Sequence, residues 1–200
     1  MGLKIDIVDK HWNQELKREG FAKHKLLVSN VGEAMEGILK VLKKQKGAKL
    51  ERLRFFGHGL PGCQLVGVKT HDAKGKKIPV DMQKVKLSLL GFGLDESTFL
   101  NQGKLQGLKG KFTTDKGFID KLFSTAPPAV VELRGCNVAA GDLGKKLLKQ
   151  LSQLWQVAVR GAEDTQLSGD DSTTNDWEGT VYQATNGKPP EALSPSAARN

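Results

Sequence analysis

Residues 130–165 read VVELRGCNVAAGDLGKKLLKQLSQLWQVAVRGAEDT, and this stretch decides the fold. An apolar run at 130–133 ends shortly before Cys136, and a second apolar run starts at Gln156 and stops at Gly161. Between them, apolar residues recur at about 3.6-residue spacing, which is typical of a helix with one buried face. These positions are 143, 147, 148, 151, 154 and 155. The stretch therefore predicts a strand, a helix and a second strand parallel to the first.

The chain before this stretch carries a similar pattern. Apolar runs at 4–8 and 25–28 predict strands, and an apolar stripe over 31–42 predicts a helix that Gly47 ends. A further predicted strand at 50–56 leads directly into the glycine-rich turn GHGLPG at 57–62. Three glycines in this turn let the backbone take positive φ and let a ligand approach closely. We expect an α/β fold with a mostly parallel sheet.

The remaining segments have shorter or less regular apolar patterns. A hairpin is expected from residues 64–68 and 78–80, and a short helix from 118–123. A last strand is expected at 181–184. The run 186–200 is rich in Pro, Ala and Ser, which predicts a disordered tail after a single domain at 1–185.

Composition excludes several classes of protein. The chain of 200 residues has 38% hydrophobic residues, no apolar stretch of membrane-spanning length and only two cysteines, so neither a membrane span nor a disulfide scaffold is expected. Residues 1–9 lack the pattern of a signal peptide, so we predict a cytoplasmic protein. The net charge of +9 could serve nucleic-acid binding, but dispersed lysines with few interleaved aromatic residues favour a solvated surface instead.

Two turns carry residues with nucleophilic chemistry. His58 and Cys136 each follow a predicted strand, and if the two strands are neighbours in a parallel sheet these side chains lie close together. Cysteine becomes a nucleophilic thiolate when a base or cation is near, and imidazole supplies either role. The backbone N–H groups of Gly59 and Cys136 could then bind an oxyanion.

The side-chain alternation of strands allows a test of this pairing. Four residues before His58 stands Arg54, and four residues before Cys136 stands Glu132. Because strand side chains repeat every two residues, the two charged groups should lie level on one face as a charge pair.

The motifs together resemble the caspase-like cysteine peptidases. The resemblance rests on GHGLPG at 57–62, LVG at 65–67, RGCNVAAG at 134–141 with Gly144, and DWE at 176–178. More narrowly, these motifs are similar to a poorly characterised caspase-like domain of large bacterial surface proteins. The similarity covers about residues 25–182.

The resemblance implies a three-layer α/β/α sandwich and a His58–Cys136 dyad that hydrolyses a peptide bond through a thioester. It also implies that Gly59 helps to hold the oxyanion and that no cofactor is needed. Some members of the clan bind calcium, and Asp170 and Asp171 in the acidic loop leave that open. Its partners would be a protein or peptide substrate, with an activating protein as a further possibility, because caspase-like enzymes are commonly held inactive.

The residue two before the cysteine often lines the first specificity pocket in this clan. Here it is Arg134, which would select an acidic residue at the cleaved position. The competing interpretation is that Glu163 or Asp164 neutralises Arg134, which then selects nothing. The sequence leaves both open.

Other functions are compatible with the same residues. A lone cysteine is more often a buried structural thiol than a nucleophile, so Cys136 gains weight only from His58 in the equivalent position of the other strand. Cys63 reads as structural. The chain could instead be a catalytically silent binding module for a peptide or anionic partner, or a toxin or defence effector that a partner activates.

Overall fold

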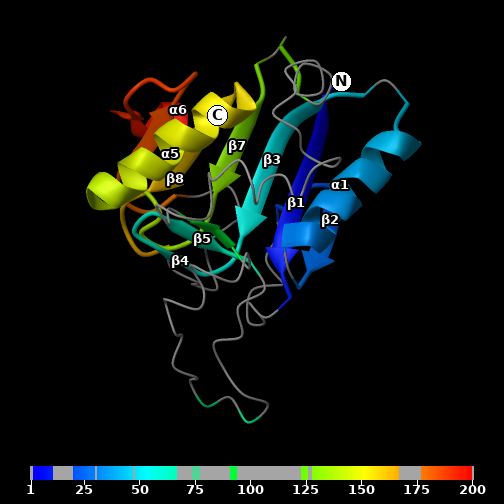
Figure 1. The fold of residues 1–200 in the computed structure, drawn as a ribbon, viewed down its shortest axis with the longest axis horizontal. Coiled ribbons are helices and arrows are strands. Elements are labelled where there is room, and N and C mark those ends of the chain that lie inside the picture. The colour runs from blue at the N-terminus through cyan, green and yellow to red at the C-terminus, as the bar shows by residue number, and fades with distance from the viewer. Residues whose placement is uncertain are drawn as a thin grey trace.

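The computed structural model describes residues 2–10, 20–29, 31–46, 48–66, 74, 76, 91–93, 123–125, 128–166 and 177–199. Its main feature is a seven-stranded sheet in the order β10-β9-β8-β7-β3-β1-β2 (Figure 1). The strands are β1 (Leu3–Asp9), β2 (His24–Val28), β3 (Leu50–Phe56), β7 (Val130–Leu133), β8 (Ala158–Ala162), β9 (Val181–Ala184) and β10 (Glu191–Ala192).

The sheet is mostly parallel, as the sequence predicts. Strand β1 pairs in parallel with β2 and β3, and β3–β7 and β7–β8 are also parallel. The pairs β8–β9 and β9–β10 are antiparallel, so the sheet is mixed at one edge. The chain therefore has an α/β fold.

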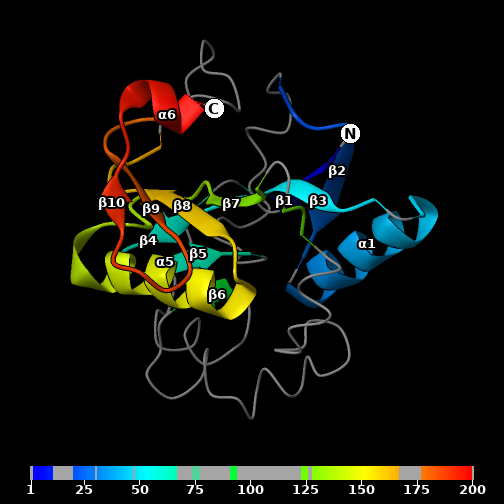
Figure 2. The same ribbon diagram turned by 90° about the horizontal axis from the view of Figure 1, so that it is seen from above.

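Two amphipathic helices cover one side of this sheet (Figure 2). Helix α1 (Val31–Lys44) buries Ala34 and Ile38, and α5 (Gly141–Trp155) buries Leu147, Leu148 and Leu151 against the sheet. The strands contribute mainly alternate side chains to this core. They are Ile5 and Ile7 of β1, Leu53 and Phe55 of β3, Val131 and Leu133 of β7, and Val159 of β8.

Strand β8 differs from its predicted bounds. Gln156 takes the left-handed conformation at the end of α5 with φ 53°, so the strand begins only at Ala158. It also runs through Gly161, where the sequence predicts its end. A Cβ at Gly161 would lie 3.2 Å from Leu148 Cδ2, so the missing side chain lets α5 pack close to the sheet.

A second, smaller sheet follows β3 along the chain. It contains β4 (Gly59–Leu60), β5 (Cys63–Leu65) and β6 (Gly91–Gly93), all antiparallel. The hairpin partner predicted at 78–80 and the helix predicted at 118–123 lie, except for Phe123, outside the described residues. Within the described residues, β5 pairs with β4 and β6.

The structure corrects the prediction of a disordered tail at 186–200. Residues after 185 form β10, which pairs with β9, and the short helix α6 (Pro195–Arg199) on the side of the sheet opposite α1 and α5 (Figure 2). Ala198 of α6 is buried with Ala162 and Val181. Small residues are weak signals along the sequence, but here they let the helix lie close to the strands, and burial of their apolar surface stabilises it.

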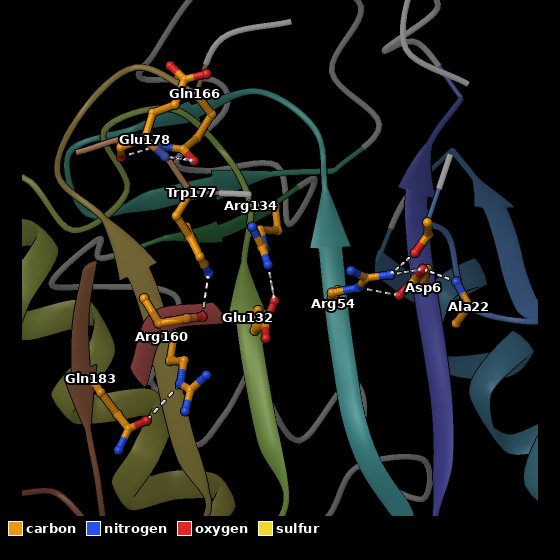
Figure 3. Close-up of polar contacts among 12 residues, drawn as sticks. Asp6, Ala22, Arg54, Glu132, Arg134, Arg160, Gln166, Trp177, Glu178 and Gln183 are labelled. Carbon is orange, nitrogen blue, oxygen red and sulfur yellow. Dashed lines mark hydrogen bonds and ion pairs between the residues drawn. The ribbon is translucent and has the colours of Figure 1, made fainter. Parts of the chain in front are cut away.

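A row of polar residues crosses the face of the sheet that α6 covers. Asp6, Arg54, Glu132, Arg160 and Gln183 lie level on five successive strands. The predicted level register of Arg54 and Glu132 is thus confirmed, but the ion pairs differ from the expected one. Arg54 donates to both carboxylate oxygens of Asp6, at 2.7 and 2.6 Å, and Glu132 pairs with Arg134, which directly follows its strand (Figure 3).

Candidate active site

The two turns predicted to carry the chemistry lie side by side. Strand β3 ends at Phe56 just before His58, β7 ends at Leu133 just before Cys136, and the strands are parallel neighbours. A further hydrogen bond from the Arg134 N–H to the Phe55 carbonyl, at 2.8 Å, extends the pairing beyond β7. The condition set in the sequence analysis, that the two strands are parallel neighbours, is thus met.

The backbones of the two turns touch through glycines. A Cβ built on Gly135 would lie 2.8 Å from the Cα of Gly59, and one built on Gly59 would clash with the carbonyl oxygen of Cys136. Real Cβ atoms do not approach other atoms this closely. Glycine is therefore required on both sides of the contact, and the residues directly after His58 and directly before Cys136 meet.

A buried glutamine that the sequence analysis did not single out bridges the same turns. Gln64 of β5 is fully buried, and its Oε1 accepts a hydrogen bond of 2.8 Å from the Gly135 N–H. Its Nε2 donates to the carbonyls of His58, at 3.3 Å, and Leu65, at 3.2 Å. A single polar residue inside the apolar run Cys63 to Val66 is the sequence signal that could have found it.

The environments of the two cysteines differ. Cys63 is buried in β5, whereas Cys136 is partly exposed, and both are free thiols. The Cys136 thiol donates to the Gln166 carbonyl over 3.5 Å. Asn137 next to it takes a positive φ of 56° and donates its N–H to the Asp164 carbonyl at 2.9 Å. Cys136 therefore lies in a turn held by the segment that follows β8.

His58 and Gly59 are anchored on the other side of the contact. His58 is partly buried, and its carbonyl accepts the Leu65 N–H at 2.8 Å. Gly59 lies in β4 directly opposite Gln64 of β5. The small sheet thus presents the His58 turn to the Cys136 turn.

Arg134 is held within the protein. It is 6% exposed, its Nη2 lies 2.7 Å from Glu132 Oε2, and its guanidinium lies 3.6 Å from the centre of the Trp177 ring. Burial lowers the pKa of Arg134 to about 10, and the charge of Glu132 opposes this shift. The partner carboxylate that the structure shows is thus Glu132, rather than the Glu163 or Asp164 considered from the sequence.

Glu163 and Asp164 have backbone roles where the chain leaves β8. The Glu163 N–H donates to the Thr180 carbonyl at 3.1 Å, and the Asp164 carbonyl accepts the N–H of Asn137. The side-chain amide of Gln166 then bonds to the backbone of Glu178 in both directions, at 2.9 and 3.3 Å (Figure 3). These contacts bring the two ends of the acidic loop together beside Cys136.

The remaining sequence predictions concern metals and membranes. Asp170 and Asp171, which leave calcium open, lie outside the described residues. Within the ranges that the structure describes, no group of three or more His, Cys, Asp or Glu residues is arranged to hold a metal ion. The helices of the described part of the chain are also too short or too polar to cross a membrane.

The fold and the contacting turns define an α/β domain with a histidine and a cysteine beyond the carboxyl ends of two neighbouring parallel strands. A family model described as a domain of unknown function, DUF4347, matches residues 93–198, more than half of the chain. The chain therefore belongs to this family. The matched region contains Cys136 and Trp177, and His58 precedes it. No curated protein and no solved structure matches the chain.

Proposed function

We propose that this protein is a caspase-like cysteine endopeptidase with a three-layer α/β/α fold and a His58–Cys136 dyad. The observation that carries the proposal is the glycine contact between Gly59 and the Gly135–Cys136 turn at the ends of adjacent parallel strands. Reactive groups of open α/β sheets gather at this edge. The helices on opposite sides of the sheet fit the proposed layers (Figure 2).

The proposed reaction needs only the side chains of the dyad and one water molecule. The Cys136 thiolate attacks the carbonyl carbon of the peptide bond, and the backbone N–H of Gly59 stabilises the oxyanion. The C–N bond then breaks, and the imidazolium of His58 gives its proton to the leaving amine. Neutral His58 next takes a proton from water, the hydroxide attacks the thioester, and the carboxylic acid leaves as the thiolate is restored.

The state of Cys136 in the structure bears on this reaction. Its S–H group donates to the Gln166 carbonyl over 3.5 Å, and a thiolate has no proton with which to keep this hydrogen bond. The thiol must therefore leave Gln166 when it ionises. A protein that awaits an activating partner would fit this arrangement.

We further propose that Arg134 does not select an acidic residue in the substrate. Its charge is opposed by Glu132, and Trp177 lies against its guanidinium. An acidic side chain would have to displace Glu132 from a buried, doubly hydrogen-bonded contact. We therefore expect the Arg134→Gln variant to cleave after Asp or Glu with the same preference as the parent protein.

The proposed dyad is tested by labelling with an acyloxymethyl ketone that alkylates reactive cysteines, followed by mass spectrometry and incubation with a peptide library. We expect labelling at Cys136 that is lost in Cys136→Ala and strongly reduced in His58→Ala. Cys63→Ala is the matched control, because it removes the buried cysteine and should leave labelling unchanged. Calcium is included in half of the samples.

The outcomes separate the candidate functions. Labelling with cleavage establishes a peptidase and reveals its specificity. Labelling without cleavage points to an enzyme that needs an activating partner. A folded protein that is never labelled at Cys136 contradicts the proposal and favours the binding module, whose affinity for an anionic partner would fall steeply with salt.

A further inference from the structure

The side chain of Gln64 is placed between the two turns of the candidate site. All three of its hydrogen bonds go to backbone groups of β5 or of these turns: the Gly135 N–H, the His58 carbonyl and the Leu65 carbonyl. The side chain is fully buried. Gln64 therefore joins the residue before Cys136 to His58 itself.

The neighbouring glycines show how closely the amide is fitted. A Cβ on Gly135 would lie 2.9 Å from Gln64 Oε1, and one on Gly57 would lie 3.5 Å from Gln64 Nε2. The amide oxygen thus lies so close to Gly135 that a side chain there would collide with it. Gln64 also stands opposite Gly59 in the β4–β5 pair, so the same residue sets the position of the glycine that touches Cys136.

We propose that Gln64 is a positioning residue for the His58–Cys136 dyad, holding the two turns at the separation at which imidazole and thiol interact. This inference rests on the proposed function, since it assigns Gln64 a role in the dyad. The chemistry requires a carboxamide at this place. The Gly135 N–H needs an acceptor and the carbonyls of His58 and Leu65 take two donors, and the neutral side chains that carry two N–H donors beside an acceptor are Gln and Asn.

The role makes a prediction about the thiol that a purely structural role does not. An imidazolium near a thiolate stabilises it and moves the pH at which the thiol ionises downward. If Gln64 sets their separation, losing its hydrogen bonds should weaken this effect while Cys136 and His58 are both still present. The reactivity of Cys136 then changes in the same direction as in a His58→Ala variant.

The test measures the rate of Cys136 alkylation by iodoacetamide between pH 5 and pH 10 in a Cys63→Ala background of the full chain. The variants are Gln64→Met, Gln64→Asn, His58→Ala and the double variant that combines Gln64→Met with His58→Ala. Gln64→Met keeps the length of the side chain without its hydrogen bonds. Ser152→Ala is the matched control. It removes a buried hydrogen bond, from the Gly187 N–H to Ser152 Oγ at 3.0 Å, at the far end of α5.

We expect the midpoint of the parent profile to lie below the ordinary thiol value of about 8.5 and to rise toward it in His58→Ala. Gln64→Met and Gln64→Asn should raise the midpoint as well. At a pH well below both midpoints, a rise of one pH unit lowers the rate by about tenfold. Because Gln64 acts through His58, the double variant should have the His58→Ala profile, and Ser152→Ala should have the parent profile.

The contrary outcomes separate this inference from the proposed function. A folded Gln64 variant with the parent profile, when His58→Ala shifts it, overturns the positioning role and leaves the dyad intact. A profile that His58→Ala does not change contradicts the dyad and with it both proposals. If Gln64→Met does not fold, Gln64→Asn carries the test, since it is neutral and keeps both hydrogen-bonding groups on a shorter side chain.

Discussion

Replacing Glu132 by Gln should destabilise the protein strongly. The Glu132 carboxylate accepts two hydrogen bonds from Arg134, at 2.8 Å from Nε and 2.7 Å from Nη2, and both side chains are almost completely buried. Arg52, Arg54 and Arg160 lie near enough to interact electrostatically with this pair, and burial also lowers the pKa of Arg160. Glu132→Gln removes the negative charge from among these arginines and keeps the shape of the side chain.

The size of the expected loss of stability follows from the burial of the Glu132–Arg134 ion pair. Breaking a buried ion pair by removing one partner costs about 3–5 kcal/mol, because the other charge stays buried without compensation. The retained amide oxygen can still accept from Arg134, which places the expected loss near the lower figure. In a chain of this length, each kcal/mol lowers the melting temperature by about 2–4 °C. We therefore expect a decrease of about 6–12 °C.

The free energy of unfolding is measured by urea denaturation at pH 7, where Arg134 is charged because its pKa of about 10 lies well above. The matched control is Lys4→Gln. Its ion pair with Glu51, at 3.4 Å, is on the surface with Lys4 48% exposed, and its loss should cost less than about 1 kcal/mol. A Glu132→Gln variant that is no less stable than Lys4→Gln would refute the reasoning. Adding Arg134→Met should recover part of the loss.

Three further predictions follow from particular contacts. Gly135→Ala should separate the two turns, because its Cβ would lie 2.8 Å from the Gly59 Cα, and the alkylation rate of Cys136 should fall well below that of the parent. An unchanged rate in Gly135→Ala would argue against the glycine contact. Removing residues 194–200 deletes α6 and the 3.1 Å hydrogen bond from Trp177 Nε1 to the Ala198 carbonyl. Tryptophan fluorescence should then shift to longer wavelength, and the protein should be less stable. If removal of the tail has neither effect, the disorder predicted from composition is favoured. Trp177→Ala should lower stability by about 1–3 kcal/mol in urea denaturation through lost stacking on Arg134, and equal stability would show that the stacking contributes nothing.

Much of the fold could be predicted from local patterns. Alternating or continuous apolar runs identify β1, β2, β3, β7 and β9, and the apolar stripes identify α1 and α5, because burial of one face imposes a period of two or about 3.6 residues. The level register of Arg54 and Glu132 also followed from the sequence, once β3 and β7 were taken as parallel neighbours. Side-chain alternation leaves few ways to align two strands whose ends carry matching turns.

The errors concern segments whose structure depends on distant partners. Composition alone made the tail look disordered, but Ala198 is buried against Ala162 and Val181, which stand far away in the sequence. The predicted ion pair of Arg54 with Glu132 was also wrong, and Glu163 or Asp164 was one of two interpretations considered for Arg134. Arg54 pairs with Asp6 and Arg134 with Glu132, since several acids lie within reach on one face of the sheet and only the side-chain conformations decide between them.

The sequence by itself determined the α/β class and the two turns that carry His58 and Cys136, because these follow from short-range hydrophobic periodicity and turn chemistry. The tertiary structure alone decided how the turns are joined and what Arg134 contacts. Gln64 binds the Gly135 N–H across a separation of 71 residues, and no local pattern marks its partner. A buried hydrogen bond of this kind depends on where two segments finally pack, and sequence periodicity carries no information about that distance.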